Sequence, residues 1–173
     1  MYLTVLANEL VTAIKNADTS NFPGSGGSGL RPKNPSGVGQ IPIYLALDPL
    51  AQLVVNGAGT ASVFVIPGYK EFRFDDNRPR NTSIKKIHGH VITLAFGWLL
   101  SDQTSKSENF DIAPSEEWVK LVDFKDDLDR FIETLSLPSK AKLIEMEANP
   151  PDEVSLDSNR FYLVSTTLIY DAC

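Results

Sequence analysis

The chain has 173 residues, a length typical of one folded domain. Its net charge of −6, with 42% hydrophobic and 22% charged residues, is typical of a globular protein and argues against a partner held through nucleic-acid phosphates. The single cysteine, Cys173, excludes an internal disulfide, and no apolar run reaches the roughly 18 residues needed to span a bilayer. The first residues lack the pattern of a signal peptide, so a reducing, cytosolic origin is expected.

The N-terminal part is predicted to be a helix followed by a long loop. Apolar residues at spacings of three and four give Leu3–Asn16 one apolar stripe. Gly, Ser, Pro and Asn dominate Asp18–Gly39, which predicts a flexible loop with little surface to bury. Its GSGGSG run could also be a phosphate-binding loop, but no strand precedes it and no GK[ST] follows.

The next stretch alternates short apolar segments with turns. Within Ile41–Val55, Asp48 is predicted to cap a short helix that has Pro49 in its first turn. Ala61–Ile66 is apolar on both faces and is predicted to be a buried strand, bent by the Pro67-Gly68 pair and continued by the more exposed Tyr69–Phe74. The following loop, Asp75–Lys86, has the densest mixed charge of the chain, which is also typical of plain solvated surface.

Lys86–Leu100 (KIHGHVITLAFGWLL) is predicted to be the central strand, because β-branched and aromatic residues dominate it. Successive side chains of a strand point to opposite faces, so the stretch divides into two sets. The large, mostly apolar set must face the core: His90, Ile92, Leu94, Phe96, Trp98 and Leu100. The small set would let a helix or a neighbouring subunit approach closely: Val91, Thr93, Ala95, Gly97 and Leu99.

The C-terminal part predicts a second long helix and a final strand. Pro114–Ser136 has an apolar stripe, a possible cap at Ser115, and a charged face that includes Lys125 and Asp126-Asp127. Ala141–Glu147 is a strand or a turn, and Phe161–Tyr170 is the last strand. No regular βαβ rhythm is present. The predicted fold is therefore one α+β domain over residues 1–173: an antiparallel sheet of about four strands, two main helices packed on it, and long polar loops.

No catalytic group stands out. His88 and His90 share one strand face and could grip a metal, but zinc sites need three or four ligands and nothing nearby completes the set. A histidine that ends an apolar face is the simpler explanation of His90. Cys173 is terminal, and no serine lies in a GxSxG turn. We therefore expect a protein that is not an enzyme and carries no cofactor or metal, with a small metal-dependent enzyme using the histidine pair as the alternative.

The order of the predicted elements resembles that of the tail terminator, or tail-completion, proteins of long-tailed bacteriophages. The resemblance covers most of the chain and rests on the VFVIP strand end, the charged loop after it and the closing FYLVSTTLIY. The loop at Asp18–Gly39 is longer than the family's pattern. The resemblance implies helices on an antiparallel sheet and subunits that form a ring, usually a hexamer. Head–tail connector proteins of the neck, adaptors or stoppers, share this order of elements and are the alternative within the same class.

What the resemblance implies about role and partners is structural. The ring would end the tail tube, join it to the head–neck connector, and belong to a virion assembled in the host cytoplasm. Its partners would be copies of itself, the tail tube protein and the connector protein, with DNA passing through without sequence-specific contact; an acidic ring would let DNA slide. Loops beside the central strands would touch neighbouring rings, which in this sequence points to Arg73, Arg78, Arg80, Lys85 and Lys86. The small strand face adds Thr93, Ala95 and Gly97 as candidate interface residues.

Overall fold

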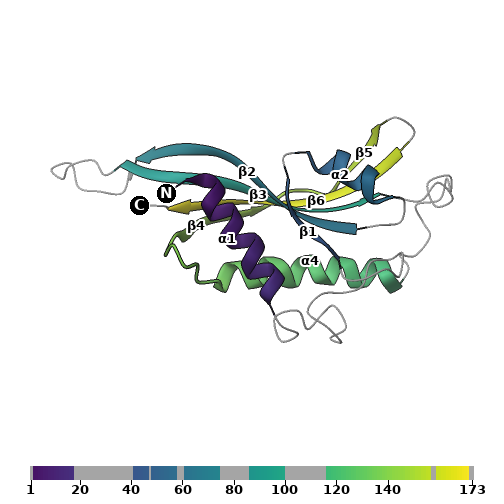
Figure 1. The fold of residues 1–173 in the computed structure, drawn as a ribbon, viewed down its shortest axis with the longest axis horizontal. Coiled ribbons are helices and arrows are strands. Elements are labelled where there is room, and N and C mark those ends of the chain that lie inside the picture. The colour runs from purple at the N-terminus through teal and green to yellow at the C-terminus, as the bar shows by residue number, and fades with distance from the viewer. Residues whose placement is uncertain are drawn as a thin grey trace.

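The computed structural model describes residues 2–17, 41–46, 48–57, 61–74, 86–99, 116–156 and 159–171. These ranges contain, in chain order, α1 (Leu3–Asn16), β1 (Ile43–Leu45), α2 (Pro49–Asn56), β2 (Ala61–Phe74), β3 (Lys86–Leu99), α4 (Glu116–Thr134), β4 (Lys142–Ala148), β5 (Asp152–Leu156) and β6 (Asn159–Asp171) (Figure 1). The predicted loop Asp18–Gly39 and the predicted cap Ser115 lie outside the described residues.

The strands form one six-stranded sheet in the order β1-β2-β3-β6-β4, with β5 also paired to β6. Because β3 occupies one side of β6, β4 and β5 follow each other along the other side. The α+β class is confirmed, but the sheet has six strands instead of about four. It is also mixed, since β1 runs parallel to β2 whereas every other pair is antiparallel. The three-residue β1 is too short to show the alternation by which strands are found in a sequence.

One face of the sheet is covered by the two long helices. Helix α1 begins and ends where the apolar stripe predicted and lies against β1 and β2, and its buried side chains join those of α4 and the large set of β3 in one cluster. The ring of Phe124 in α4 meets the edge of Phe96 in β3, with the ring centroids 6.4 Å apart. The buried cluster on this face draws its largest members from both helices and the central strands: Leu6, Leu10, Ile14, Ile92, Leu94, Phe96, Phe124, Leu128, Ile132, Leu168 and Tyr170.

The opposite face is covered at one end by the short helix α2. As predicted, Asp48 caps this helix, and its carboxylate accepts a hydrogen bond from the Ala51 amide at 3.1 Å. Gly97 of β3 lies directly beneath α2. A Cβ atom added to Gly97 would lie 2.8 Å from a methyl carbon of Leu53 and 3.2 Å from the ring of Phe64. The layer that approaches the small face of β3 at this point is therefore a helix of the same chain.

Strand β2 continues through the predicted bend as one element with a bulge. The pairing with β3 shifts register between Pro67 and Lys70. Proline has no amide hydrogen for the ladder, so the irregularity falls where a regular pair cannot form. Gly68 follows, and a Cβ there would lie 2.8 Å from the carbonyl oxygen of Val91. Only glycine allows β2 and β3 to approach so closely at this bend.

A polar pair is buried on the helix-covered face at the far end of β3. His90 and Tyr170 are register partners on β3 and β6, with 1% and 2% of their surface exposed. The position of His90 on the core face confirms the division of β3 into two sets. The side chain of His88, two residues earlier, is outside the described part. Burial raises the pKa of the Tyr170 hydroxyl, which has no hydrogen-bond partner among the described residues.

Tyr170→Phe is expected to preserve or raise the free energy of unfolding at neutral pH, because it removes a buried hydroxyl that no described group binds. The raised pKa also predicts an alkaline effect. Above the ordinary value of 10.0, unfolded chains lose the Tyr170 proton while folded chains keep it. The wild-type protein therefore loses about 1.4 kcal/mol of stability per pH unit from this group, and the variant does not. Urea unfolding at neutral pH and above pH 10 measures this difference; equal alkaline losses would contradict it.

Candidate functional site

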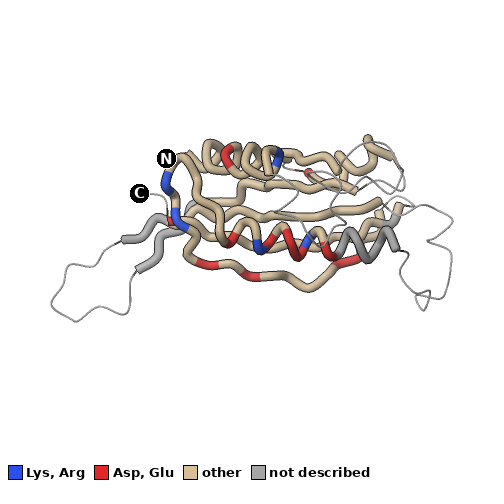
Figure 2. Tube along the Cα trace, turned by 90° about the horizontal axis from the view of Figure 1, so that it is seen from below, with Lys and Arg blue, Asp and Glu red and all other residues tan. Residues whose placement is uncertain are grey.

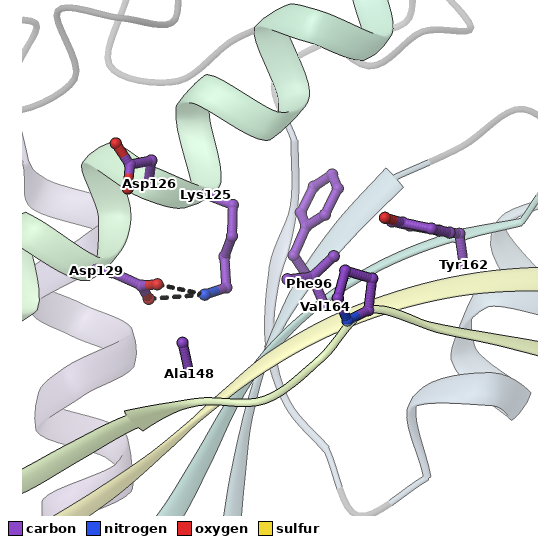
Figure 3. Close-up of a pocket in the computed structure, with 8 residues that line it drawn as sticks. Phe96, Lys125, Asp126, Asp129, Ala148, Tyr162 and Val164 are labelled. Atoms are coloured by element: carbon purple, nitrogen blue, oxygen red, sulfur yellow. Dashed lines mark hydrogen bonds and ion pairs between the residues drawn. The ribbon is translucent and has the colours of Figure 1, made fainter. Parts of the chain in front are cut away.

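A pocket with a volume of about 210 Å³ opens between α4 and the helix-covered face of the sheet. Three of its lining residues come from α4, three from β3 and β6, and two from the β4 end and the connection to β5. Figure 3 shows the charged side chains of α4 on one side and the aromatic and aliphatic side chains of the sheet on the other. The pocket is lined by Phe96, Lys125, Asp126, Asp129, Ala148, Pro151, Tyr162 and Val164.

The spacing of apolar residues in α4 determines which side chains reach this pocket. Phe124, Leu128 and Ile132 recur every four residues and are buried against the sheet. Lys125 and Asp129 each follow an apolar anchor by one position, so they lie at the flank of the buried stripe and not on the outer face. On the sheet, Thr166 replaces an apolar residue in the core-facing row of β6 and lies next to this flank.

Lys125, Asp129 and Thr166 form a compact buried cluster beside the pocket. The ammonium nitrogen of Lys125 lies 2.7 Å from both carboxylate oxygens of Asp129 and 2.7 Å from the hydroxyl oxygen of Thr166. The Thr166 hydroxyl in turn lies 3.0 and 3.1 Å from the two Asp129 oxygens, so it donates to the carboxylate. The Lys125 side chain is 6% exposed and that of Asp129 is 21% exposed. These are charge-assisted hydrogen bonds in a largely dry setting.

The hydrogen bonds of this cluster hold the Lys125 ammonium in place, so its nitrogen is not available for a reaction. A lysine ammonium has three N–H donors, and three oxygen acceptors surround this one. A nucleophilic lysine needs a free approach to its nitrogen, whereas this nitrogen is buried and surrounded by its three acceptors. The arrangement therefore suits binding and packing, with the apolar floor of the pocket beside it.

The rim of the pocket is acidic. Asp126 points outward and is paired with Arg130 at 2.9 Å, with both side chains largely exposed. From Asp123 to Glu153 the chain has nine acidic and four basic residues. Figure 2 shows these acids along α4 and along the neighbouring strand β4. On the sheet side, burial raises the pKa of the Tyr162 hydroxyl above its ordinary value of 10.0.

The predicted interface residues do not gather at this pocket. Ala95 and Gly97 are buried under α2, and packing within the chain explains their small size. Thr93 is half-buried on the same face, beyond the end of α2. Arg73 and Lys86 belong to the paired ends of β2 and β3, but their side chains are not described. Arg78, Arg80 and Lys85 lie outside the described residues.

Two charged residues of α4 are buried although the sequence pattern did not predict it. Lys125 and Asp127 were assigned to the solvated face, but only 5% and 6% of their surface is exposed. The assignment was wrong because it treated every charged residue as outward-facing. A signal was present on the other side of the contact: Thr166 interrupts the row of large residues in β6. A hydroxyl in a buried row needs a polar partner, which here is the Lys125–Asp129 pair.

Other features of the described residues carry less chemistry. A more open hollow of about 530 Å³ lies between α1 and the segment after α4, where the Glu9 carboxylate accepts from the Ser139 amide at 3.3 Å. In the described part of the chain, no three His, Cys, Asp or Glu residues are grouped so as to hold a metal ion. The helices that the structure describes include none with both the length and the apolarity to cross a membrane.

No family model matches this chain, and no curated protein matches it. One solved structure with a similar chain is described as "Virion of native gene transfer agent (GTA) particle". The match covers 80% of this chain and 83% of that chain, with 13% sequence identity and a TM-score of 0.28. A similarity of this size assigns neither a family nor a function to the protein.

Proposed function

We propose that this protein is a structural virion subunit that forms a homo-oligomeric ring, ends the phage tail tube and joins it to the head–neck connector. The proposal rests on the resemblance in element order, and the observation that supports it best is the uneven covering of the sheet. Two long helices cover one face, whereas among the described residues only the short α2 packs on the other. Beyond α2, the described residues Thr93, Ser165 and Thr167 on that face are only partly buried, which leaves room there for contact with another subunit.

The chemistry of this surface suits an assembly contact. Thr93, Ser165 and Thr167 present half-buried hydroxyls at the centre of the sheet. The side-chain amide of Asn149 donates to the hydroxyls of Ser165 and Thr167 at 3.0 and 3.2 Å, which holds this row in place. Small, ordered hydroxyl side chains allow close approach and can exchange hydrogen bonds with a partner. We define this surface as the hydroxyl face.

Thr93→Lys is expected to prevent ring formation without lowering the melting temperature. A lysine in the middle of the hydroxyl face would place an unpaired charge in the subunit contact, whereas in the free subunit its ammonium can extend into water. Mass photometry and negative-stain microscopy measure the ring, which should have a mass that is a multiple of 19.0 kDa. Thermal unfolding of the monomer monitors the fold.

Thr12→Lys is the matched control, because Thr12 is exposed on α1 and away from this face. It should leave both assembly and melting unchanged. A wild-type protein that stays monomeric at all concentrations, alone and with the tail tube protein, would contradict the proposed function. Disruption of the gene in its phage should give filled heads with tails of uncontrolled length or tails that cannot join; normal infectious particles would contradict the role.

A further inference from the structure

We infer that the α4 pocket receives an arginine side chain, from Arg78 or Arg80, of a neighbouring copy of this chain. The inference rests on the proposed ring, because it names one contact between subunits. It combines three observations: the shape and lining of the pocket, the distribution of charge along the chain, and the distance between the pocket and the basic segment.

The pocket has the size and surfaces that a single long basic side chain needs. Its volume of about 210 Å³ is below the roughly 300–1,000 Å³ of pockets for drug-sized ligands. Val164 and Pro151 offer an apolar surface to the methylene groups of an arginine. Tyr162 offers an aromatic ring to the planar guanidinium, and Asp126 offers a carboxylate at the rim (Figure 3).

The acidic residues near the pocket favour a basic side chain as its occupant, and the segment 77–86 of this sequence is rich in such residues. Lys125 is paired with Asp129, so Asp126 is the remaining charged residue of the pocket lining, and further acids lie along α4 and β4 (Figure 2). The Asp126–Arg130 pair is exposed and contributes little, so Asp126 can take a new partner at small cost. Residues 77–86 contain four basic residues and no acid, the opposite of the pocket rim.

Residues 75–85 are too few to bring Arg78 or Arg80 to the pocket of their own molecule. Phe74 and Lys86 are register partners, so residues 75–85 are anchored at one end of the β2–β3 hairpin. Eleven residues held at both ends reach at most about 20 Å from their base, and an extended arginine side chain raises this to about 27 Å. Phe96, at the pocket, lies ten residues along β3 from Lys86, or about 33 Å. The arginine must therefore come from another copy, and a contact between two different surfaces is the kind that generates rings.

Charge reversal tests the contact in the full-length protein. Asp126→Lys is expected to weaken association at least about tenfold in sedimentation equilibrium, because it places like charges together. Arg78→Glu with Arg80→Glu should weaken it by a similar factor, and combining all three changes should restore most of the loss. Glu133→Lys, at an exposed position of α4 outside the pocket lining, makes the same charge change and should have little effect. Equal losses from Asp126→Lys and Glu133→Lys, or no restoration by the combined variant, would overturn the inference and leave the ring untouched.

A second measurement does not depend on ring formation. A peptide of residues 75–86 should shift the amide NMR signals of Tyr162 and Val164 when it is added to the full-length Thr93→Lys variant, which is designed to be monomeric. The shifts should saturate, weaken with added salt, and disappear with Asp126→Lys or with a peptide carrying Arg78→Gln and Arg80→Gln. If the wild type fails to assemble but the peptide binds, the pocket assignment stands and the ring fails. Absence of these shifts overturns the pocket assignment.

Discussion

Asp129→Ala should lower the free energy of unfolding by about 3–5 kcal/mol, because it leaves the Lys125 ammonium buried without its carboxylate. The Lys125 side chain is only 6% exposed, and two of its three acceptors are the oxygens of Asp129. Water cannot replace a carboxylate at that depth without disturbing the contact between α4 and β6. Urea unfolding followed by circular dichroism measures the loss.

Two further variants separate this effect from a general weakening of α4. Asp126→Ala removes a second i,i+4 ion pair among the described side chains of α4, whose members are 65% and 74% exposed, and should cost less than about 0.5 kcal/mol. Lys125→Met combined with Asp129→Leu removes both charges and should recover most of the stability lost in Asp129→Ala. Similar small losses in Asp129→Ala and Asp126→Ala would mean that the Lys125 ammonium is solvated.

Gly97→Leu is expected to destabilise the protein by about 2–3 kcal/mol, at the upper end of the range for overpacking. Even a single added carbon would lie 2.8 Å from Leu53 and 3.0 Å from Leu163. The added side chain must therefore push α2 away from the sheet. Because α2 belongs to the same chain, the loss should appear in the melting temperature of the monomer. Differential scanning calorimetry on dilute protein measures it.

Leu53→Ala provides the compensating change. Alone it should cost about 2–5 kcal/mol by leaving a cavity, and together with Gly97→Leu the cost should be clearly less than the sum of the two. Thr93→Leu, on the same face of β3 but beyond α2, should change the monomer's stability little. If Gly97→Leu leaves melting unchanged, α2 does not stay packed over Gly97 in solution.

Hydrophobic periodicity accounted for the parts of the fold that rest on long, regular patterns. The apolar stripe of Leu3–Asn16 predicted α1 with its observed bounds, and the Asp48-Pro49 pair predicted the start of α2. The two-sided character of β3 followed from alternation alone. By contrast, β1 and β5 have three and five residues, and β5 carries acids at its first two positions. Their place in the sheet is set by pairing with β2 and β6, which a local pattern does not encode.

The pocket was harder to predict because its residues come from separate parts of the chain. Lys125 and Asp129 are charged residues on a helix, and charge alone placed them in solvent. Their burial depends on the position of Thr166, 41 residues after Lys125, in the strand beneath. Tyr162 and Phe96 become neighbours of α4 only when β3 and β6 pair. A polar residue in an otherwise apolar strand row was the one local sign of this contact.

The central position of β3 also has a consequence for how the chain folds. Strand β3 joins the β2–β3 hairpin to the hairpin that ends in β6, and Leu99 pairs with Phe161 while Gly89 pairs with Asp171. Every pair along this seam joins residues more than 60 positions apart, whereas the pairs near each turn are local. Local hairpins form within about 1–10 μs. Pairing of β3 with β6 must first close a long loop, and the entropy lost in closing it precedes any stabilisation from the new contacts. The joining of β3 to β6 should therefore limit the folding rate. Substitutions that weaken the β3–β6 pairing, such as Ala95→Gly, should slow folding. Substitutions that weaken only contacts formed after this pairing should mainly speed unfolding.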